Sequence, residues 1–467
     1  MLFARIYDED LAQASYFIGC QATGEAAVVD PRRDVRVYLD EAENNGMGIV
    51  ALTETHIHAD YLSGSRELAA ATGAPLYLSG EGPAEWQYGF EGEKLHDGDE
   101  IRVGNVTLRA IHTPGHTPEH VSFLVTDTET TDEPGFVLTG DFVFVGDLGR
   151  PDLLDEVAGE KDTRFVGARQ MFASLRERFL ALPDYVQLWP GHGAGSACGK
   201  DLGAVPSSTV GYERLFSWWG RYMERNDEEG FVEALLEGQP DAPAYFGRMK
   251  HQNKVGPALL GTRPPLRPYD AASLGTSLAC GEVKFVDTRP YEDFARGAVP
   301  GSLNIPAGGS FATWASWVID PEKDERSIVL LARDETEASD LRDKLSYVGI
   351  DNVVGYATSL EDLEMERVST VSPASLEELG DPFALDVRGK GEFVASHIPG
   401  ATQLHGGQVM WHLEELPRDR PIVVYCQTGS RSAVVASALR AAGFGEVVEL
   451  EGSYQGYQKA EEQTVGA

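Results

Sequence analysis

Short apolar runs alternate with amphipathic helical stretches along the first half of the chain. The expected strands are Ser15–Gly19, Ala26–Val29, Ile49–Leu52 and Pro75–Leu78. Helical spacing of apolar residues is found over Val35–Glu43 and Arg164–Leu180. In the second stretch, the apolar positions at intervals of three or four are Phe165, Ala168, Phe172, Leu175 and Phe179. The alternation predicts an α/β fold for a first unit of residues 1–235.

The pattern changes between residues 236 and 268. Proline-containing pairs interrupt regular structure there: Gln239-Pro240, Ala242-Pro243, Gly256-Pro257 and Arg263-Pro264. We therefore expect a connector, with one short helix near Tyr245–Lys250.

The remainder of the chain contains an internal repeat. The segments that align are Phe285–Arg289 with Ala384–Arg388, Phe294–Gly301 with Phe393–Gly400, and Ser327–Leu331 with Pro421–Tyr425. Each copy alternates strands with helices over roughly 100 residues, an α/β pattern. The predicted domains are residues 269–366 and 367–467.

Length and charge limit the function classes. A chain of 467 residues is expected to hold about three domains at about 150 residues each. With 39 basic and 74 acidic residues the net charge is −35, which disfavours nucleic acids and anionic membranes as partners. No apolar run approaches the roughly 20 residues of a membrane span, and the first residues lack a signal-peptide pattern, so we expect a soluble, cytoplasmic protein. The four cysteines form no CxxC pair, which favours reduced thiols.

Imidazoles and carboxylates gather where predicted strands end. Thr55–Tyr61, with the sequence THIHADY, follows Ile49–Leu52, and His112–His116 follows Val106–Ile111. Asp141 follows Phe136–Leu138, and His192 comes later in a Pro-Gly-His segment. Strand ends fix side chains while the adjoining turns admit substrate, so these clusters predict a metal site.

The order HxHxD, TPGH, TGD and PGH resembles the metallo-β-lactamase superfamily, whose fold is an αββα sandwich. The details THxHADY, TGDFVF and GDLGRPD resemble its persulfide dioxygenase branch, over the first half of the chain. That resemblance implies one Fe²⁺ per chain, bound by His56, His116 and Asp141, with about three open positions for dioxygen and substrate.

Other residues of the same motifs have less direct expected roles. Tyr61 stands where two-metal hydrolases of the superfamily have a histidine, and a phenol with a pKa near 10 is a poor ligand, which weakens a two-metal interpretation. The outer residues His58, Asp60 and His192 would orient the ligands or donate hydrogen bonds. The sequence leaves open that His58 is a third ligand on zinc.

Two residues near these motifs have two interpretations each. By the resemblance, Arg150 lies near the substrate pocket and would hold an anionic thiol substrate; the alternative is a surface ion pair with Asp152. Cys198 is either a buried structural thiol or a redox thiol near the site.

A second candidate site is the loop Cys426–Arg431, between the apolar strand Ile422–Tyr425 and the alanine-rich helix Ser432–Ala442. A cysteine at such a turn faces backbone N–H groups and the positive end of the helix dipole, which lower its pKa. Gly429 permits a tight curl, and Arg431 adds positive charge.

The Asp-x-Arg motif, the His-Ile-Pro-Gly-Ala motif and a strand that ends in cysteine resemble the rhodanese fold, present here twice. Rhodaneses carry sulfane sulfur as a cysteine persulfide, which implies that Cys426 is the nucleophile. The six-residue loop is one residue shorter than that of the related dual-specificity phosphatases, which favours sulfur over phosphate.

The aligned loop of the first repeat is Ala332–Glu337. Ala332 replaces the cysteine, Glu335 the glycine and Glu337 the arginine. This repeat is therefore expected to be inactive and to act as a spacer. Cys280 lies outside the loop and is expected to serve packing.

Together these features predict an iron-dependent persulfide dioxygenase fused to an inactive and an active rhodanese domain. The expected substrates are a small-molecule thiol persulfide and dioxygen, with sulfite and thiosulfate as products, a sulfide-detoxification function. The alternatives are a zinc thioester hydrolase of the glyoxalase II type with an appended rhodanese, and a sulfide- or redox-sensing module. The sequence leaves open which thiol carries the persulfide and whether the chain forms a homo-oligomer.

Overall fold

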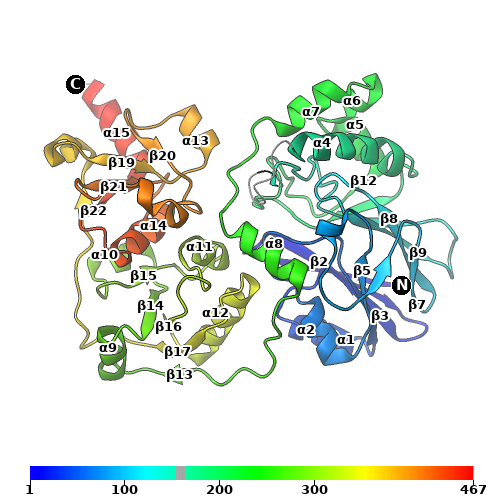
Figure 1. The fold of residues 1–467 in the computed structure, drawn as a ribbon, viewed down its shortest axis with the longest axis horizontal. Coiled ribbons are helices and arrows are strands. Elements are labelled where there is room, and N and C mark those ends of the chain that lie inside the picture. The colour runs from blue at the N-terminus through cyan, green and yellow to red at the C-terminus, as the bar shows by residue number, and fades with distance from the viewer. Residues whose placement is uncertain (154, 156–162, 466–467) are drawn as a thin grey trace. The chain divides into compact units, whose positions relative to one another are not determined.

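The computed structural model describes residues 1–153, 155 and 163–465, and the chain forms two compact units (Figure 1). The first unit consists of Met1–Ala242 and Phe246–Gly261. The second consists of Pro243–Tyr245 and Thr262–Ala467.

The first unit contains two six-stranded sheets. The strand order in one is β1-β2-β3-β4-β5-β6, with β1 and β2 antiparallel and β3, β4, β5 and β6 parallel neighbours. Its strands are β1 Leu2–Asp8, β2 Gln13–Cys20, β3 Glu25–Val29, β4 Gly48–Thr53, β5 Leu76–Ser79 and β6 Glu93–Leu95. The order in the other sheet is β12-β11-β10-β9-β8-β7. Its strands are β7 Glu100–Val103, β8 Val106–His112, β9 Val121–Asp127, β10 Phe136–Gly140, β11 Gln187–Pro190 and β12 Ser208–Thr209.

Three apolar cores define the layers of the first unit. The helices are α1 Arg36–Asn44, α2 Ser65–Thr72, α4 Thr163–Ser174, α5 Val210–Phe216, α6 Gly220–Arg225, α7 Glu228–Leu236 and α8 Phe246–Val255. Tyr16 and Phe123, from different sheets, share one core. Tyr38 of α1 packs on the outer face of the first sheet, and Phe172 of α4 on that of the second. Burying apolar faces on both sides of each sheet gives the four-layer αββα sandwich, which confirms the expected fold class.

The amphipathic helix predicted over 164–180 is α4 followed by a short π-helical turn, Leu175–Phe179. Ala168, Phe172, Leu175 and Phe179 are buried, as the spacing indicates. Phe165, the first of the five apolar positions, is 38% exposed, so the apolar stripe is not buried along its whole length. Phe165 lies in the first turn of α4, where the guanidinium of Arg164 lies over its ring.

Helix α8 lies within the connector predicted from the sequence, yet it belongs to the first unit. We call Phe246–Gly261 the strap. Its Lys254 carbonyl accepts a hydrogen bond from the Gly89 N–H (2.7 Å). Farther along, the carboxylate of Glu67 accepts hydrogen bonds from the N–H groups of Leu260 (2.7 Å) and Gly261 (3.0 Å). The strap is therefore fastened to the first unit at several points.

The second unit contains two five-stranded parallel sheets with the same topology. Their orders are β13-β17-β16-β14-β15 and β18-β22-β21-β19-β20. The strands of the first are β13 Arg267–Pro268, β14 Val283–Asp287, β15 Leu303–Asn304, β16 Ser327–Leu331 and β17 Val353–Ala357. Those of the second are β18 Thr370–Val371, β19 Phe383–Asp386, β20 Thr402–Gln403, β21 Ile422–Tyr425 and β22 Val447–Leu450. The identical orders match the internal repeat seen in the sequence.

Helices connect the parallel strands of the second unit. In the first repeat they are α9 Ala271–Ala279, α10 Tyr291–Arg296, α11 Phe311–Val318 and α12 Glu335–Tyr347. In the second they are α13 Lys390–Ala395 and α14 Ser430–Ala441, and α15 Ser453–Val465 follows the last strand. Helices α12 and α14 follow the equivalent strands β16 and β21, so the two loops compared in the sequence occupy equivalent positions.

All four cysteines are free thiols. Cys280 is exposed, so the expectation that it serves packing was wrong; it follows the last residue of α9, where the chain turns toward β14. Across residues 1–153, 155 and 163–465, no helix is long and apolar enough to cross a membrane.

Candidate metal centre and sulfurtransfer site

The ends of β4, β8 and β10 bring three ligand-type side chains together. His56 follows β4, His116 follows β8 and Asp141 follows β10, and one donor atom of each lies within 4.8 Å of the others. The Oδ2 atom of Asp141 is 3.8 Å from His56 Nε2 and 3.6 Å from His116 Nε2. All three side chains are buried. The strand-end clusters of the sequence therefore meet at one point.

Hydrogen bonds orient both imidazoles. Thr55 Oγ1 donates to Asp30 Oδ2 (2.9 Å), so it accepts from His56 Nδ1 (3.0 Å). His116 Nδ1 donates to the carbonyl of Arg150 (3.1 Å). With each Nδ1 carrying the proton, each Nε2 presents a lone pair to the centre.

The donor atoms at the centre are buried without an internal partner. His56 Nε2 and both carboxylate oxygens of Asp141 have no hydrogen-bond partner in the part of the chain that the structure describes. Burial lowers the pKa of His56 well below its usual value and also lowers that of His116, so both rings are neutral. Two neutral imidazoles and one carboxylate, otherwise unsatisfied, fit a divalent metal ion.

A second group lies beside the first. Donor atoms of Asp60, His192 and Cys198 also lie within 4.8 Å of one another. His192 Nδ1 donates to the Ala12 carbonyl (3.1 Å), and its Nε2 faces Asp60 Oδ2 (3.2 Å) and Asp141 Oδ1 (3.5 Å). Burial, followed by the charges of Asp141 and Asp60, raises the pKa of the Cys198 thiol well above its usual value. Cys198 is thus buried and also lies near the metal site, which combines features of its two interpretations; whether it is a redox thiol stays a prediction.

His58 and Tyr61 belong to neither group, and both contact Asp30. His58 Nε2 lies 3.1 Å from Asp30 Oδ1, and the Tyr61 hydroxyl donates to the Asp30 carbonyl (3.3 Å). Burial disfavours the imidazolium of His58, but the carboxylates of Asp30, Glu54 and Asp60 outweigh it and raise the pKa to about 9. Burial raises the pKa of the Tyr61 phenol well above its usual value, so it stays protonated. These contacts favour orientation of the metal loop over metal ligation.

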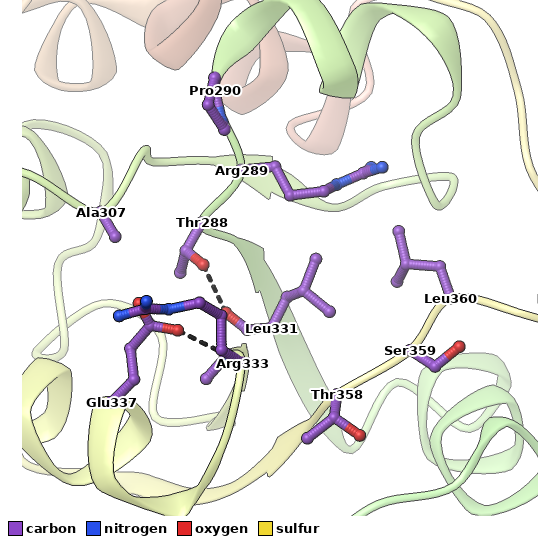
Figure 2. Close-up of a pocket in the computed structure, with 11 residues that line it drawn as sticks. Thr288, Arg289, Pro290, Ala307, Leu331, Arg333, Glu337, Thr358, Ser359 and Leu360 are labelled. Carbon is purple, nitrogen blue, oxygen red and sulfur yellow. Dashed lines mark hydrogen bonds and ion pairs between the residues drawn. The ribbon is translucent and has the colours of Figure 1, made fainter.

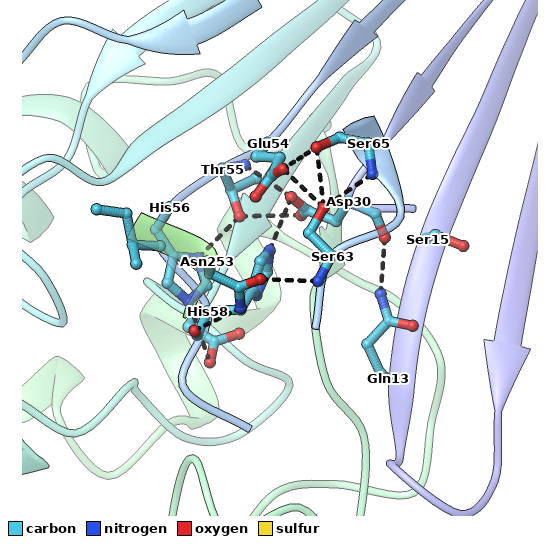
Figure 3. A network of polar contacts seen from close by, with 12 residues as sticks. Gln13, Ser15, Asp30, Glu54, Thr55, His56, His58, Ser63, Ser65 and Asn253 are labelled. Atoms are coloured by element: carbon cyan, nitrogen blue, oxygen red, sulfur yellow. Dashed lines mark hydrogen bonds and ion pairs between the residues drawn. The ribbon is translucent and has the colours of Figure 1, made fainter. Parts of the chain in front are cut away.

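Several residues that sequence reasoning missed hold this metal loop, residues 55–63. Asp30 Oδ1 accepts from the Thr55 N–H (2.7 Å) and Glu119 Oε1 from the Ile57 N–H (2.8 Å), while Asn253 contacts its far end (Figure 3). Asp30 directly follows β3, so the strand-end rule applied to the other clusters could have found it. Glu119 and Asn253 carry no comparable local signal.

Gly191 explains the glycine of the Pro-Gly-His segment. Strand β11, which ends at Pro190, pairs in parallel with β10, so the following residues lie against the end of β10. A Cβ atom at Gly191 would lie 2.8 Å from Asp141 Oδ1, closer than packing allows. Glycine therefore lets His192 approach the metal-site carboxylate.

Arg150 is fully buried in this structure. Its Nε and Nη2 donate to the two carboxylate oxygens of Asp152 (3.0 and 2.5 Å), and its Nη1 donates to the Ala197 carbonyl (3.1 Å). The ion pair of the alternative interpretation is present, but it is buried rather than on the surface. Substrate binding by Arg150 stays a prediction, while these contacts tie its loop to the one that carries Cys198.

Cys426 lies in the tight turn between β21 and α14. Its Sγ accepts hydrogen bonds from the Gly429 N–H (3.1 Å) and from the hydroxyls of Ser432 (3.6 Å) and Ser453 (3.8 Å). Gly429 has a φ of 121°, a conformation that side chains disfavour. Burial raises the thiol pKa, but Ser432, Gly429 and the charge of Arg431 outweigh it, so the pKa of Cys426 is lowered.

Ion pairs stabilise the residues around the Cys426 turn. Arg431 donates to both carboxylate oxygens of Glu392 on α13 (2.7 and 2.8 Å). Arg388 of the Asp-x-Arg motif pairs with Asp386 and donates to the Gln427 side chain (3.1 Å). The Asp287–Arg289 pair repeats this arrangement in the first repeat. The motif shared by the repeats is thus a structural brace next to each loop.

In the loop of the first repeat, Ala332–Glu337, the side chain of Glu337 binds another residue of the same loop. The Glu337 carboxylate accepts hydrogen bonds from the Arg333 N–H (2.6 Å) and from Arg333 Nε (2.8 Å), beside a cavity of about 470 Å³ (Figure 2). Ala332 lies in the lining of that cavity, where the second repeat has Cys426. A carboxylate of the chain itself therefore occupies donors of the loop.

The fold and the two sites define a metal-binding αββα protein followed by a duplicated rhodanese-type unit. The family model described as "Metallo-beta-lactamase superfamily" matches residues 8–192, and "Rhodanese-like domain" matches residues 270–366 and 373–460. The chain belongs to the metallo-β-lactamase superfamily and carries two rhodanese-like domains, as the motifs indicated.

Known proteins resemble different parts of the chain. A solved structure of a metallo-β-lactamase from Staphylococcus aureus is 40% identical with a TM-score of 0.68, and the match covers 76% of this chain and 98% of that one. A hydroxyacylglutathione hydrolase from Rhodospirillum rubrum is 32% identical over 38% of this chain and 60% of its own length. The mitochondrial persulfide dioxygenase ETHE1 of Bos taurus is 24% identical over 46% of this chain and 75% of its own length.

Proposed function

We propose that this protein is an iron-dependent persulfide dioxygenase joined to a sulfurtransferase. The first unit converts a small-molecule thiol persulfide (RSSH), dioxygen and water into the thiol (RSH), sulfite and two protons. The second unit transfers sulfane sulfur through Cys426. Together the two units form thiosulfate, and this conversion detoxifies sulfide in the cytoplasm.

His56, His116 and Asp141 would hold one Fe²⁺ per chain. When bound by two imidazoles and one carboxylate, Fe²⁺ leaves positions where dioxygen and a sulfur substrate can meet, which supplies the oxidation chemistry. Asp30, Glu119 and the neighbours of the ligands keep the donor atoms in place.

In the second unit, the Cys426 thiolate attacks the outer sulfur of a persulfide. The S–S bond of the substrate breaks, the thiolate RS⁻ leaves, and Cys426 becomes a persulfide. Sulfite then attacks the outer sulfur of Cys426, which forms thiosulfate and returns the thiolate. The Gly429 N–H and the Ser432 hydroxyl, both hydrogen-bonded to Sγ, stabilise its negative charge.

One observation carries this proposal. A two-histidine, one-carboxylate donor set lies in the first unit, and a cysteine in a hydrogen-bonded turn lies in the second. Sulfite is the product of the first chemistry and an acceptor for the second, so one chain can perform both steps.

The second candidate is a two-metal zinc thioester hydrolase with an appended rhodanese. The group Asp60, His192 and Cys198 favours it, because Asp141 lies between this group and the two histidines and could bridge two ions. The internally bonded Tyr61 and the intact Cys426 turn favour the dioxygenase.

Metal content separates the two candidates. We expect one iron per chain in anaerobically purified protein, both in the wild type and in Cys198→Ser, because Cys198 lies outside the three-ligand set. Elemental analysis, run beside oxygen uptake on a persulfide and hydrolysis of a glutathione thioester, measures this. Two zinc ions in the wild type, one in Cys198→Ser, and thioesterase activity without oxygen uptake would favour the hydrolase.

A further inference from the structure

Asn253 of the strap reaches into the metal loop. Its Nδ2 donates hydrogen bonds to the carbonyls of His58 (2.8 Å) and Tyr61 (2.6 Å), and its Oδ1 accepts one from the Ser63 N–H (2.9 Å) (Figure 3). The side chain is buried. The distance along the chain is 190 residues or more for each contact.

The side-chain amide of Asn253 satisfies three polar backbone groups of the metal loop. An asparagine has two N–H donors and an acceptor oxygen, and the loop offers two carbonyls and one N–H. Only this orientation of the amide satisfies all three. Without it, three backbone groups of the loop would be buried with no partner, and the turn after His58 would lose its support.

We propose that Asn253 is a positioning residue of the metal centre. By fixing the turn from His58 to Ser63, it holds Asp60 beside His192 and keeps His56, four residues before Asp60, aimed at Asp141. The strap is therefore part of the metal site rather than a passive connector. The inference rests on the metal site of the proposed function, but not on which metal is bound or which reaction follows.

Other contacts dock the strap without touching the metal loop. Glu67 accepts from the N–H groups of Leu260 and Gly261, and the Lys250 ammonium lies 3.8 Å from the ring centroid of Trp86. Loss of Asn253 should therefore leave the strap in place while it loosens the loop. This separation makes the role of Asn253 testable.

The test uses the full-length chain with Asn253→Ala and Asn253→Asp. The aspartate keeps the acceptor for Ser63 but directs a negative oxygen at two carbonyls. We expect both variants to bind Fe²⁺ and Zn²⁺ roughly 10- to 100-fold more weakly, the range found when groups that orient metal ligands are removed. Anaerobic competition with a chromophoric chelator measures each affinity, so the result does not depend on dioxygenase activity.

Two variants serve as controls. His251→Ala changes an exposed residue of α8, and Glu67→Ala releases the far end of the strap. Both should keep the wild-type metal affinity, and thiosulfate sulfurtransfer through Cys426 should be unchanged in every variant. Wild-type affinity in Asn253→Asp, or an equal loss in Glu67→Ala, would overturn the inference. If the Asn253 variants lost Zn²⁺ affinity but the wild type showed no oxygen uptake, the role of Asn253 would stand. Only the proposal of a dioxygenase would then be refuted.

Discussion

At the scale of single residues, the charge of Arg431 is shared between Glu392 and the sulfur of Cys426. The guanidinium donates to both oxygens of Glu392 and also lowers the pKa of Cys426. The thiolate is the reactive form, so the strength of this pairing decides the pH at which Cys426 becomes active.

Substitutions on the two sides of this pair should shift the pH profile in opposite directions. Arg431→Gln removes the cation, so the pKa of Cys426 rises and the acid limb of the thiosulfate:cyanide activity moves to higher pH. Glu392→Gln removes a nearby negative charge and releases Arg431 toward the sulfur, so the limb moves to lower pH. Rate measurements across pH 5 to 9, roughly the range over which a perturbed thiol titrates, check this. Shifts of the same sign would show that Arg431 acts through loop structure alone.

At the scale of elements, the loops before α12 and α14 differ in what fills them. In the second repeat the Gly429 N–H points at a sulfur atom, whereas in the first repeat Glu335 replaces that glycine and the Glu337 carboxylate accepts hydrogen bonds from the N–H and the side chain of Arg333. The surrounding sheets have the same strand order. The replacements at positions 332, 335 and 337 are therefore the basis for the expected difference in activity.

Ala332→Cys alone should therefore give no sulfurtransfer in a full-length chain that also carries Cys426→Ser. Glu337 would remain beside the new thiol and raise its pKa. Adding Glu335→Gly and Glu337→Arg gives positions 332, 335 and 337 the residues of the second repeat and should restore measurable turnover. The assay is thiosulfate:cyanide transfer, with the Cys426→Ser chain as the blank. Turnover by Ala332→Cys without the other two changes would show that Glu337 does not block the loop.

The elements that the sequence predicted well are those with local signals. Apolar runs such as Ile49–Leu52 and Ile422–Tyr425 became strands, and the residues just after the strands met at the two sites. These signals are local because a strand end fixes where the next side chain points. Asn253 shows the opposite case, since its partners lie at least 190 residues away and nothing in its own helix marks the contact.

For Cys198 the sequence left two interpretations open and did not identify its neighbours, for a related reason. Its segment contains glycines and no periodic pattern, so its distance from Asp60 and His192 depends on how the chain folds back. The proline pairs predicted a connector over residues 236–268, and they carry no sign that residues 246–261 belong to the first unit. Composition reports local flexibility and says nothing about which surface a segment later covers.

At the scale of the whole molecule, the two proposed chemistries lie in different compact units. Cys426→Ser should leave oxygen uptake on a persulfide nearly intact, because Cys426 is not among the metal-site residues, and sulfite should accumulate in place of thiosulfate. An oxygen electrode run beside sulfite and thiosulfate quantification checks the outcome. If oxygen uptake stopped while iron stayed bound, persulfide would have to pass through Cys426 to reach the metal.

The converse substitution completes this test. His116→Ala removes a metal ligand, so iron content and oxygen uptake should be lost. Sulfurtransfer from thiosulfate through Cys426 should continue at the wild-type rate, since the second unit has its own core. Parallel loss of sulfurtransfer in a folded, iron-free chain would mean that the units are not independent.

The carboxylate of Glu337 also limits what a single substitution at position 332 can bring. A mutation that places cysteine at position 332 meets a loop in which Glu337 already binds the N–H and the side chain of Arg333, so we expect it to bring no advantage on its own. Selection cannot favour an intermediate that brings no benefit, so an active loop in the first repeat requires several changes at once. An active site in the first repeat would therefore require the substitutions at positions 332, 335 and 337 together, although its cavity and its sheet already have the arrangement that such a site needs.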